Sequence, residues 1–188
     1  MVLLFLLLAC GSKPSVESIY LSGGNWQIHR NEEFNAELEG IVINFQVDRR
    51  QHYYCIYECS GKIEWPTPIL DIDIDSSTVS LNSLEKIAIR AMHSDLMIRG
   101  GKEVNVHMLS GDLWMEAFPE SSITILSSDG DVDVNLPSSD WQTRLFGDDI
   151  INQVTPDEYN KRGFLEVYSV NGSIRVIEVA SISQRGSN

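Results

Sequence analysis

The stretch SITILSSDGDVDV, residues 122–134, contains two short segments in which aliphatic and polar residues alternate. Alternation with a period of two is typical of a β-strand that buries one face. Asp129, Gly130 and Asp131 separate the two segments. Glycine favours a tight corner because it adopts a positive φ angle without a steric penalty. The stretch therefore predicts a strand, a corner and a second strand.

The same pattern recurs along the chain. A Gly or Ser followed by Asp or Ser opens an alternating strand in HSDLMIR (93–99), SGDLWMEAF (110–118), DGDVDVNLP (129–137), FGDDIINQV (146–154) and NGSIRVIEV (171–179). The steps between successive corners are 17, 19, 17 and 25 residues, measured at Asp95, Asp112, Asp131, Asp148 and Ser173. A unit of this size with two short strands suits one coil of a β-solenoid, in which stacked coils bury a continuous core.

We therefore predict an all-β, single-domain β-solenoid with coils of 17–19 residues. An antiparallel β-sandwich is the alternative that the same alternation permits. In the solenoid the corners Asp95, Asp112, Asp131 and Asp148 are expected to climb along one edge. The residues expected to face inward are Ile87, Ile89, Leu96, Ile98, Val104, Val106, Leu113, Met115, Ile123, Ile125, Val132, Val134, Leu165, Val167, Ile174 and Val176.

The predicted β-solenoid covers residues 17–180, and a flexible tail is predicted at 181–188. Residues 17–66 are richer in aromatic residues and match the repeat poorly. We interpret this segment as an N-terminal cap or a first sheet, which is a role that terminal repeats commonly take.

An apolar run, MVLLFLLLAC, begins the chain and ends at a cysteine. It is shorter than the stretch of about 20 residues that spans a bilayer, and it suits the hydrophobic region of a signal peptide. The segment Leu7-Leu8-Ala9-Cys10 resembles the lipobox of bacterial lipoproteins. The resemblance implies a signal peptide at 1–9, a lipidated Cys10 with a linker at 10–16, and attachment to the outer membrane, facing the periplasm or the exterior. A simple secretory signal with an incidental cysteine is the alternative.

Two further cysteines, Cys55 and Cys59, lie in the segment YYCIYEC. Export implies an oxidising compartment in which disulfides persist. Residues four apart in a flat strand lie about 13 Å from each other, so a disulfide between these two requires a bend or a bulge. A disulfide and a pair of free thiols both remain open, and a metal site would need further ligands.

Three aspartates, Asp129, Asp131 and Asp133, alternate around Gly130. Calcium needs about six to eight converging oxygens, whereas side chains on one face of a strand stand about 6.6 Å apart. We interpret Asp131 as a corner residue and Asp133 as an outward residue of the next strand. A calcium site at these three residues is the weaker interpretation, and no metal or other cofactor is predicted.

The formal net charge of −13 disfavours binding to nucleic acid, whose phosphates attract clustered Lys and Arg. The sequence contains no GxSxG elbow, P-loop, HExxH or dinucleotide fingerprint. We therefore predict no enzymatic activity and no catalytic residues.

The repeats EVNVHMLSGDLWM (103–115), SITILSSDGDVDV and FLEVYSVNGSIRV (164–176) resemble those of adhesin-type domains of unknown function in exported bacterial proteins. The resemblance covers residues 70–180. It implies a β-solenoid with an adhesin-like role and with neither an established ligand nor catalytic residues.

Aligning the repeats places Trp114 at the outward position that Met97, Asp133 and Arg175 occupy in other coils. Exposed aromatic residues suit the binding of carbohydrate or protein. We predict a binding surface at Met97, Trp114 and Arg175, with a glycan or an envelope protein as partner. The alternative function is that of a structural envelope protein that self-associates through stacked coils. A monomer is expected, because the net charge opposes self-stacking.

Overall fold

The computed structural model describes residues 16–137, 140–154 and 162–179, and in these ranges every regular element is a β-strand. No helix long and apolar enough to cross a membrane occurs there. The strands are β1 (Ser18–Ser22), β2 (Asn25–Arg30), β3 (Asn35–Val47), β4 (Arg50–Trp65), β5 (Ile69–Asp75), β6 (Thr78–Asn82), β7 (Lys86–Met92), β8 (Asp95–Arg99), β9 (Glu103–Met108), β10 (Leu113–Glu116), β11 (Ser122–Asp129), β12 (Val132–Leu136), β13 (Trp141–Phe146), β14 (Asp149–Gln153), β15 (Gly163–Asn171) and β16 (Ser173–Glu178).

The strands belong to one sheet that folds back on itself, in the order β13-β15-β11-β9-β7-β5-β1-β4-β2-β6-β8-β10-β12-β16-β14. We call the side formed by β1, β5, β7, β9, β11, β15 and β13 the odd face, and the side formed by β2, β6, β8, β10, β12, β16 and β14 the even face. The long strand β4 contributes to both sides, because Arg50–Tyr54 pairs with β1 and Ser60–Trp65 pairs with β2.

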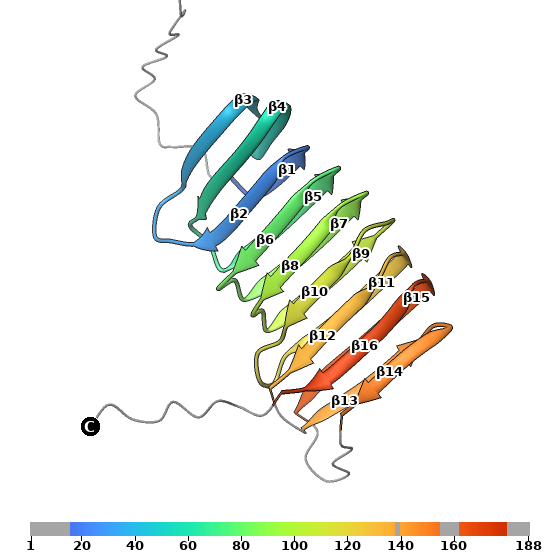
Figure 1. The fold of residues 1–188 in the computed structure, drawn as a ribbon. Helices are drawn as coiled ribbons and strands as arrows, with labels where there is room; N and C mark the ends of the chain where they lie inside the picture. The colour runs from blue at the N-terminus through green and yellow to red at the C-terminus, as the bar shows by residue number, and fades with distance from the viewer. Residues whose placement is uncertain (1–15, 138–139, 155–161, 180–188) are drawn as a thin grey trace, which may run out of the picture.

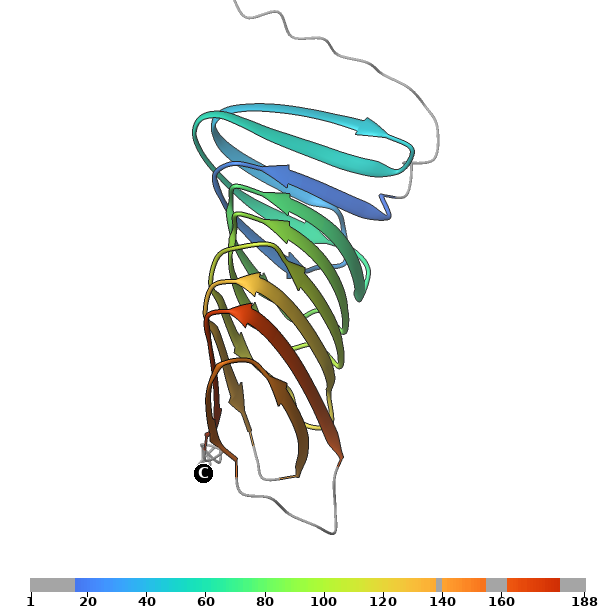
Figure 2. The same ribbon diagram turned by 90° about the vertical axis from the view of Figure 1, so that its right-hand side faces the viewer.

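All pairings between the described strands are parallel except that of β3 with β4. Successive units of strand, corner and strand lie on one another around a common interior (Figures 1 and 2). The fold is therefore all-β and consistent with a β-helix. Antiparallel pairing, on which the sandwich alternative depends, is limited to β3 and β4 among the described strands.

The interior is a column of aliphatic side chains. All sixteen residues predicted to face inward are buried, and none is more than 3% exposed, which confirms that prediction. Burying one such side chain contributes roughly 1.5–3 kcal/mol, so coils gain stability by stacking. Large aromatic side chains are buried toward the two ends of the column: Trp26, Tyr53 and Trp65 at the N-terminal end, and Trp141 at the other.

The corners stack as directly as the strands do. The Asp112 N–H donates to the Asp95 carboxylate at 3.0 Å, and the Asp131 N–H donates to Asp112 at 3.0 Å. Ser173 continues this ladder, since its N–H donates to Asp131 at 2.8 Å. Hydrogen bonds from the Ser173 backbone and hydroxyl lower the pKa of Asp131, because they stabilise its ionised form.

The prediction that Asp148 continues the climb of corners is wrong. β15 lies between β11 and β13, and β16 lies between β12 and β14, so Ser173 stands next to Asp131 (Figure 1). Within β14, Asp149 and not Asp148 pairs with Ser173. The corner of the last coil is also shorter. Asp149 follows Phe146 by three residues, whereas in the neighbouring coil Ser173 follows Tyr168 by five residues. This unit, β13 and β14, lies at the end of the stack.

The opposite end of the stack is formed by β3 and β4, which lie within the predicted cap at 17–66 (Figure 1). β3 exposes Ile43, Phe45 and Val47. The domain boundaries stay predictions. The signal peptide at 1–9, Cys10 and the tail at 181–188 lie outside the described residues.

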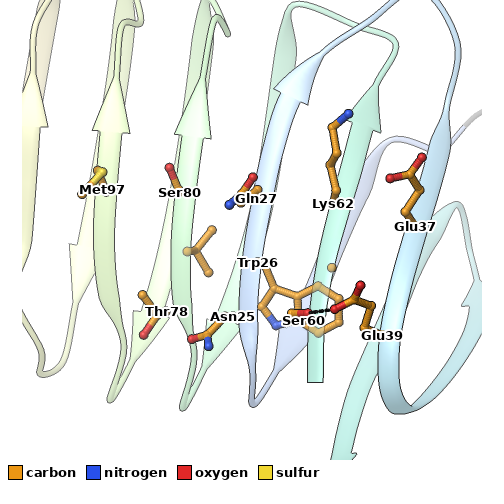
Figure 3. A pocket seen from close by; sticks show the side chains of 12 residues that line it. Asn25, Trp26, Gln27, Glu37, Glu39, Ser60, Lys62, Thr78, Ser80 and Met97 are labelled. Carbon is orange, nitrogen blue, oxygen red and sulfur yellow. Dashed lines mark hydrogen bonds between the residues drawn. The ribbon is translucent and has the colours of Figure 1, made fainter. Parts of the chain in front are cut away.

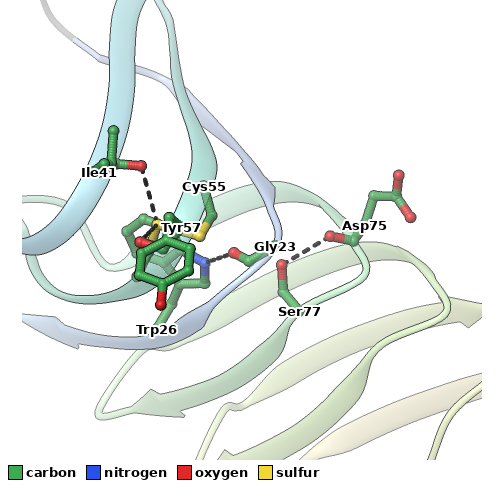
Figure 4. Close-up of a disulfide and its surroundings, with 8 residues drawn as sticks. Gly23, Trp26, Ile41, Cys55, Tyr57, Asp75 and Ser77 are labelled. Atoms are coloured by element: carbon green, nitrogen blue, oxygen red, sulfur yellow. Dashed lines mark hydrogen bonds between the residues drawn. A yellow bond between two sulfur atoms is a disulfide. The ribbon is translucent and has the colours of Figure 1, made fainter.

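A disulfide joins Cys55 and Cys59 at the bend of β4 (Figure 4). Glu58 adopts a φ of 44°, and the pairing of β4 with β3 is irregular between Glu39 and Val42. The bend brings the two Cα atoms to 5.6 Å, within the range that a disulfide spans. The side chains of Cys55 and Cys59 lie against Gly23 and Gly24, so the disulfide braces the corner of β4 where it stacks on the corner between β1 and β2.

Removing this disulfide should destabilise the protein modestly. Its two cysteines are only 4 positions apart in sequence, so closing the loop removes little entropy from the unfolded chain. We expect the double variant Cys55→Ala, Cys59→Ala to lose about 2 kcal/mol of unfolding free energy, measured by urea denaturation. The native protein should lose a similar amount in the presence of a reductant. An unchanged urea midpoint in both experiments would contradict a structural role for the disulfide.

Candidate functional site

The parallel register aligns outward side chains of the even face into rows that cross the strands. The row that contains Trp114, which we call the tryptophan row, is Glu37, Lys62, Gln27, Ser80, Met97, Trp114, Asp133 and Arg175. A second row, the corner row, lies next to the corners and comprises Glu39, Ser60, Asn25, Thr78, Asp95, Asp112, Asp131 and Ser173.

Two hollows lie along these rows. The first has a volume of about 370 Å³ and includes Glu37, Lys62 and Gln27 in its lining (Figure 3). The second has a volume of about 350 Å³ and includes Trp114 and Asp133. Thr78 and Met97 line both hollows, so the two hollows are adjacent and together extend across the strands. We call the two together the even-face groove.

The three predicted surface residues all lie in the tryptophan row. Met97 pairs with Trp114, and Asp133 separates Trp114 from Arg175. Arg175 Nε lies 2.7 Å from the Asp133 carboxylate, so Arg175 is engaged in an ion pair one strand beyond the groove. Trp114 is half-buried, and the Arg99 guanidinium lies 5.5 Å from the centre of its ring. Trp114 and Met97 therefore line the groove, and Arg175 borders it.

The groove is acidic, although most of its exposed surface comes from apolar atoms. Its lining carries six carboxylates, from Glu37, Glu39, Asp95, Asp112, Asp131 and Asp133. The cation in the lining, Lys62, lies 3.4 Å from Glu64 and is partly neutralised by it. Neutral hydrogen-bonding groups complete the surface: Asn25, Gln27, Ser60, Thr78 and Ser80. This set offers hydrogen bonds and an aromatic ring to a ligand.

The structure does not gather Asp129, Asp131 and Asp133 into a group that could hold a metal ion, and the calcium site stays a hypothesis from sequence. Within the ranges that the structure describes, no group of three or more His, Cys, Asp or Glu side chains is arranged to hold a metal ion. Asp131 accepts hydrogen bonds from Ser173, and Asp133 is paired with Arg175. Two of the three carboxylates thus have protein partners.

A larger hollow of about 810 Å³ on the odd face was not predicted. Exposed apolar side chains of Met92, Leu109 and Val170 lie in its lining, together with Tyr168. The charges nearby are paired with each other, since Arg90 contacts both Asp71 and Asp73. The sequence does place an apolar outward residue just before several corners. Whether these residues form one surface depends on which coils are neighbours.

No protein family model matches the chain, and no curated protein matches its sequence. Among solved structures, the fold is similar to that of a “putative cell adhesion protein” from Clostridium sporogenes ATCC 15579, with a TM-score of 0.41 and 14% identity over 88% of this chain and 94% of that one. It is also similar to a “putative adhesin” from Bacteroides fragilis NCTC 9343, with a TM-score of 0.46 and 10% identity over 87% and 93% of the two chains. At such identities the likeness concerns the fold and does not identify a ligand.

Proposed function

We propose that this protein is a non-enzymatic, adhesin-like binding module, built as a β-solenoid, whose even-face groove receives an extended ligand. The observation that carries the proposal is the adjacency of the two hollows: they share Thr78 and Met97, and the half-buried Trp114 lines one of them.

The shape of the groove favours a long ligand over a compact one. It crosses β2, β6, β8, β10 and β12, and each strand adds a residue to its lining. Neighbouring strands lie roughly 4.8 Å apart, so the groove offers hydrogen-bonding groups at regular intervals.

Binding through this groove predicts a specific effect of Trp114→Ala. Purified full chain should bind to envelope fragments of the bacterium that produces it, and Trp114→Ala should weaken that binding about tenfold, which corresponds to about 1.4 kcal/mol. Met92→Ala, which removes an exposed apolar side chain from the odd face, is the matched control and should bind like the native protein. Equal affinities of all three proteins for the fragments would contradict the proposal.

One structural observation favours the alternative, a self-associating envelope protein. β13 and β14 end the described strand order, and Phe146, Ile150 and Ile151 are exposed on them. A terminal strand can pair with a strand of a second chain. Light scattering on the same purified protein distinguishes the two functions, because the binding module stays monomeric and the alternative forms larger assemblies as concentration rises.

The proposal includes attachment to the outer membrane through lipid on Cys10, with the module facing the periplasm or the exterior. Its support is the resemblance of residues 7–10 to a lipobox, because Cys10 itself lies outside the described residues. Two acyl chains would anchor the protein stably. In the producing bacterium, Cys10→Ala should move the protein from the membrane fraction to the soluble fraction. A variant that remains in the membrane fraction would contradict lipidation at Cys10.

A further inference from the structure

We infer that the ligand of the even-face groove is an uncharged polysaccharide that lies across the strands with one sugar ring stacked on Trp114. This inference rests on the function proposed above and adds the chemical class of the ligand and its direction.

Trp114 provides the stacking surface. Of the four tryptophans in the chain, Trp26, Trp65 and Trp141 are at most 3% exposed, whereas Trp114 is half-buried and lines the groove. The guanidinium of Arg99 lies over the indole and restrains it, which lowers the entropy cost of ordering the ring on binding. The C–H face of a sugar packs well on such a ring while its hydroxyls remain free to form hydrogen bonds.

The hydroxyls of a sugar would find partners along both rows. Side-chain amides and hydroxyls come from Asn25, Gln27, Thr78 and Ser80. Asp95 and Asp112 each use one carboxylate oxygen, Oδ1, to accept the N–H of the next corner. Their second oxygens point to no partner within the described residues, and they can accept a hydroxyl hydrogen bond from a ligand.

The charge of the groove selects among polysaccharides. Six carboxylates line it, of which Asp133 is paired with Arg175, and its lysine is partly neutralised by Glu64. Uronic acid or phosphate groups would be repelled, because like charges brought together at a desolvated surface cost binding energy. An uncharged chain meets no such penalty and still satisfies the polar groups.

The spacing of the strands fits a repeating ligand. Equivalent positions of the two rows recur every roughly 4.8 Å, which is similar to the length of one sugar unit in an extended polysaccharide. A polysaccharide lying across the strands would therefore meet comparable side chains at each sugar unit. The polysaccharide would run along the tryptophan row, in the direction given by the order Glu37, Lys62, Gln27, Ser80 and Met97 (Figure 3).

The test separates the envelope polysaccharides by charge and uses Trp114 as the reporter. Polysaccharides extracted from the same envelope are divided by anion exchange into a neutral fraction that flows through and an anionic fraction that is retained. Each fraction is added to the full chain while acrylamide quenching of tryptophan fluorescence is measured. Because the other tryptophans are buried, protection from the quencher reports Trp114.

We expect the neutral fraction to protect Trp114 and the anionic fraction to have no effect. Periodate, which cleaves the vicinal diols of sugars, should abolish protection. In a pull-down with the neutral fraction, Trp114→Ala and Gln27→Ala should bind at least about fivefold more weakly, Trp114→Phe should retain most of the affinity through its ring, and Met92→Ala should match the native protein. Circular dichroism of each variant confirms that it is folded.

Each other outcome overturns the inference in a recognisable way. If the full chain binds the envelope through Trp114 but binding survives periodate treatment, or lies in the anionic fraction, the ligand class is wrong and the proposed binding function stands. If the neutral fraction binds equally well to Trp114→Ala and Gln27→Ala, the groove is not its site. If the envelope does not bind at all, the proposed function fails as well.

Discussion

The close stacking of glycine corners is the constraint on which the rest of the structure depends. Gly130 has a φ of 111°, and a Cβ atom at this position would collide with the carbonyl oxygen of Gly111. Gly172 meets Gly130 in the same way, and Gly111 meets Ser94. Because the backbones of successive corners are in such close contact, each corner can take only one position relative to the next. The hydrogen bonds from each corner N–H to the preceding Asp95, Asp112 or Asp131 carboxylate hold that position.

The register of the strands follows from the corners, and the surfaces follow from the register. A shift by one residue would exchange the buried and the exposed faces of a strand. In the observed register, Leu113 and Met115 are buried while Trp114 lies between Met97 and Asp133. The groove is therefore no property of one coil. It exists because residues from β2, β3, β4, β6, β8, β10 and β12 stand in two rows at a constant spacing.

The local sequence pattern predicts which residues of each coil are buried and which are exposed. Alternation in EVNVHM and SITIL identifies the buried Val104, Val106, Ile123 and Ile125, and aligning the repeats places Trp114 next to Met97. Which coils are neighbours is a different question, because every coil offers a similar aliphatic edge. The insertion of β15 and β16 before the last coil and the groove itself depend on contacts between units distant in sequence.

The unfolding free energy of Gly130→Ala, compared with that of Gly147→Ala, tests the role of the corners most directly. Both substitutions add one methyl group at a corner, but Gly147 has no positive φ. A Cβ there would meet the flexible Ile174 side chain at 3.1 Å and the Ser169 carbonyl oxygen at 3.2 Å, which are tight contacts but not collisions. We predict that Gly130→Ala lowers the unfolding free energy by about 3 kcal/mol or more, from backbone strain and the clash with Gly111, and that Gly147→Ala lowers it by less than about 1 kcal/mol. Equal urea midpoints for the two variants would contradict the account.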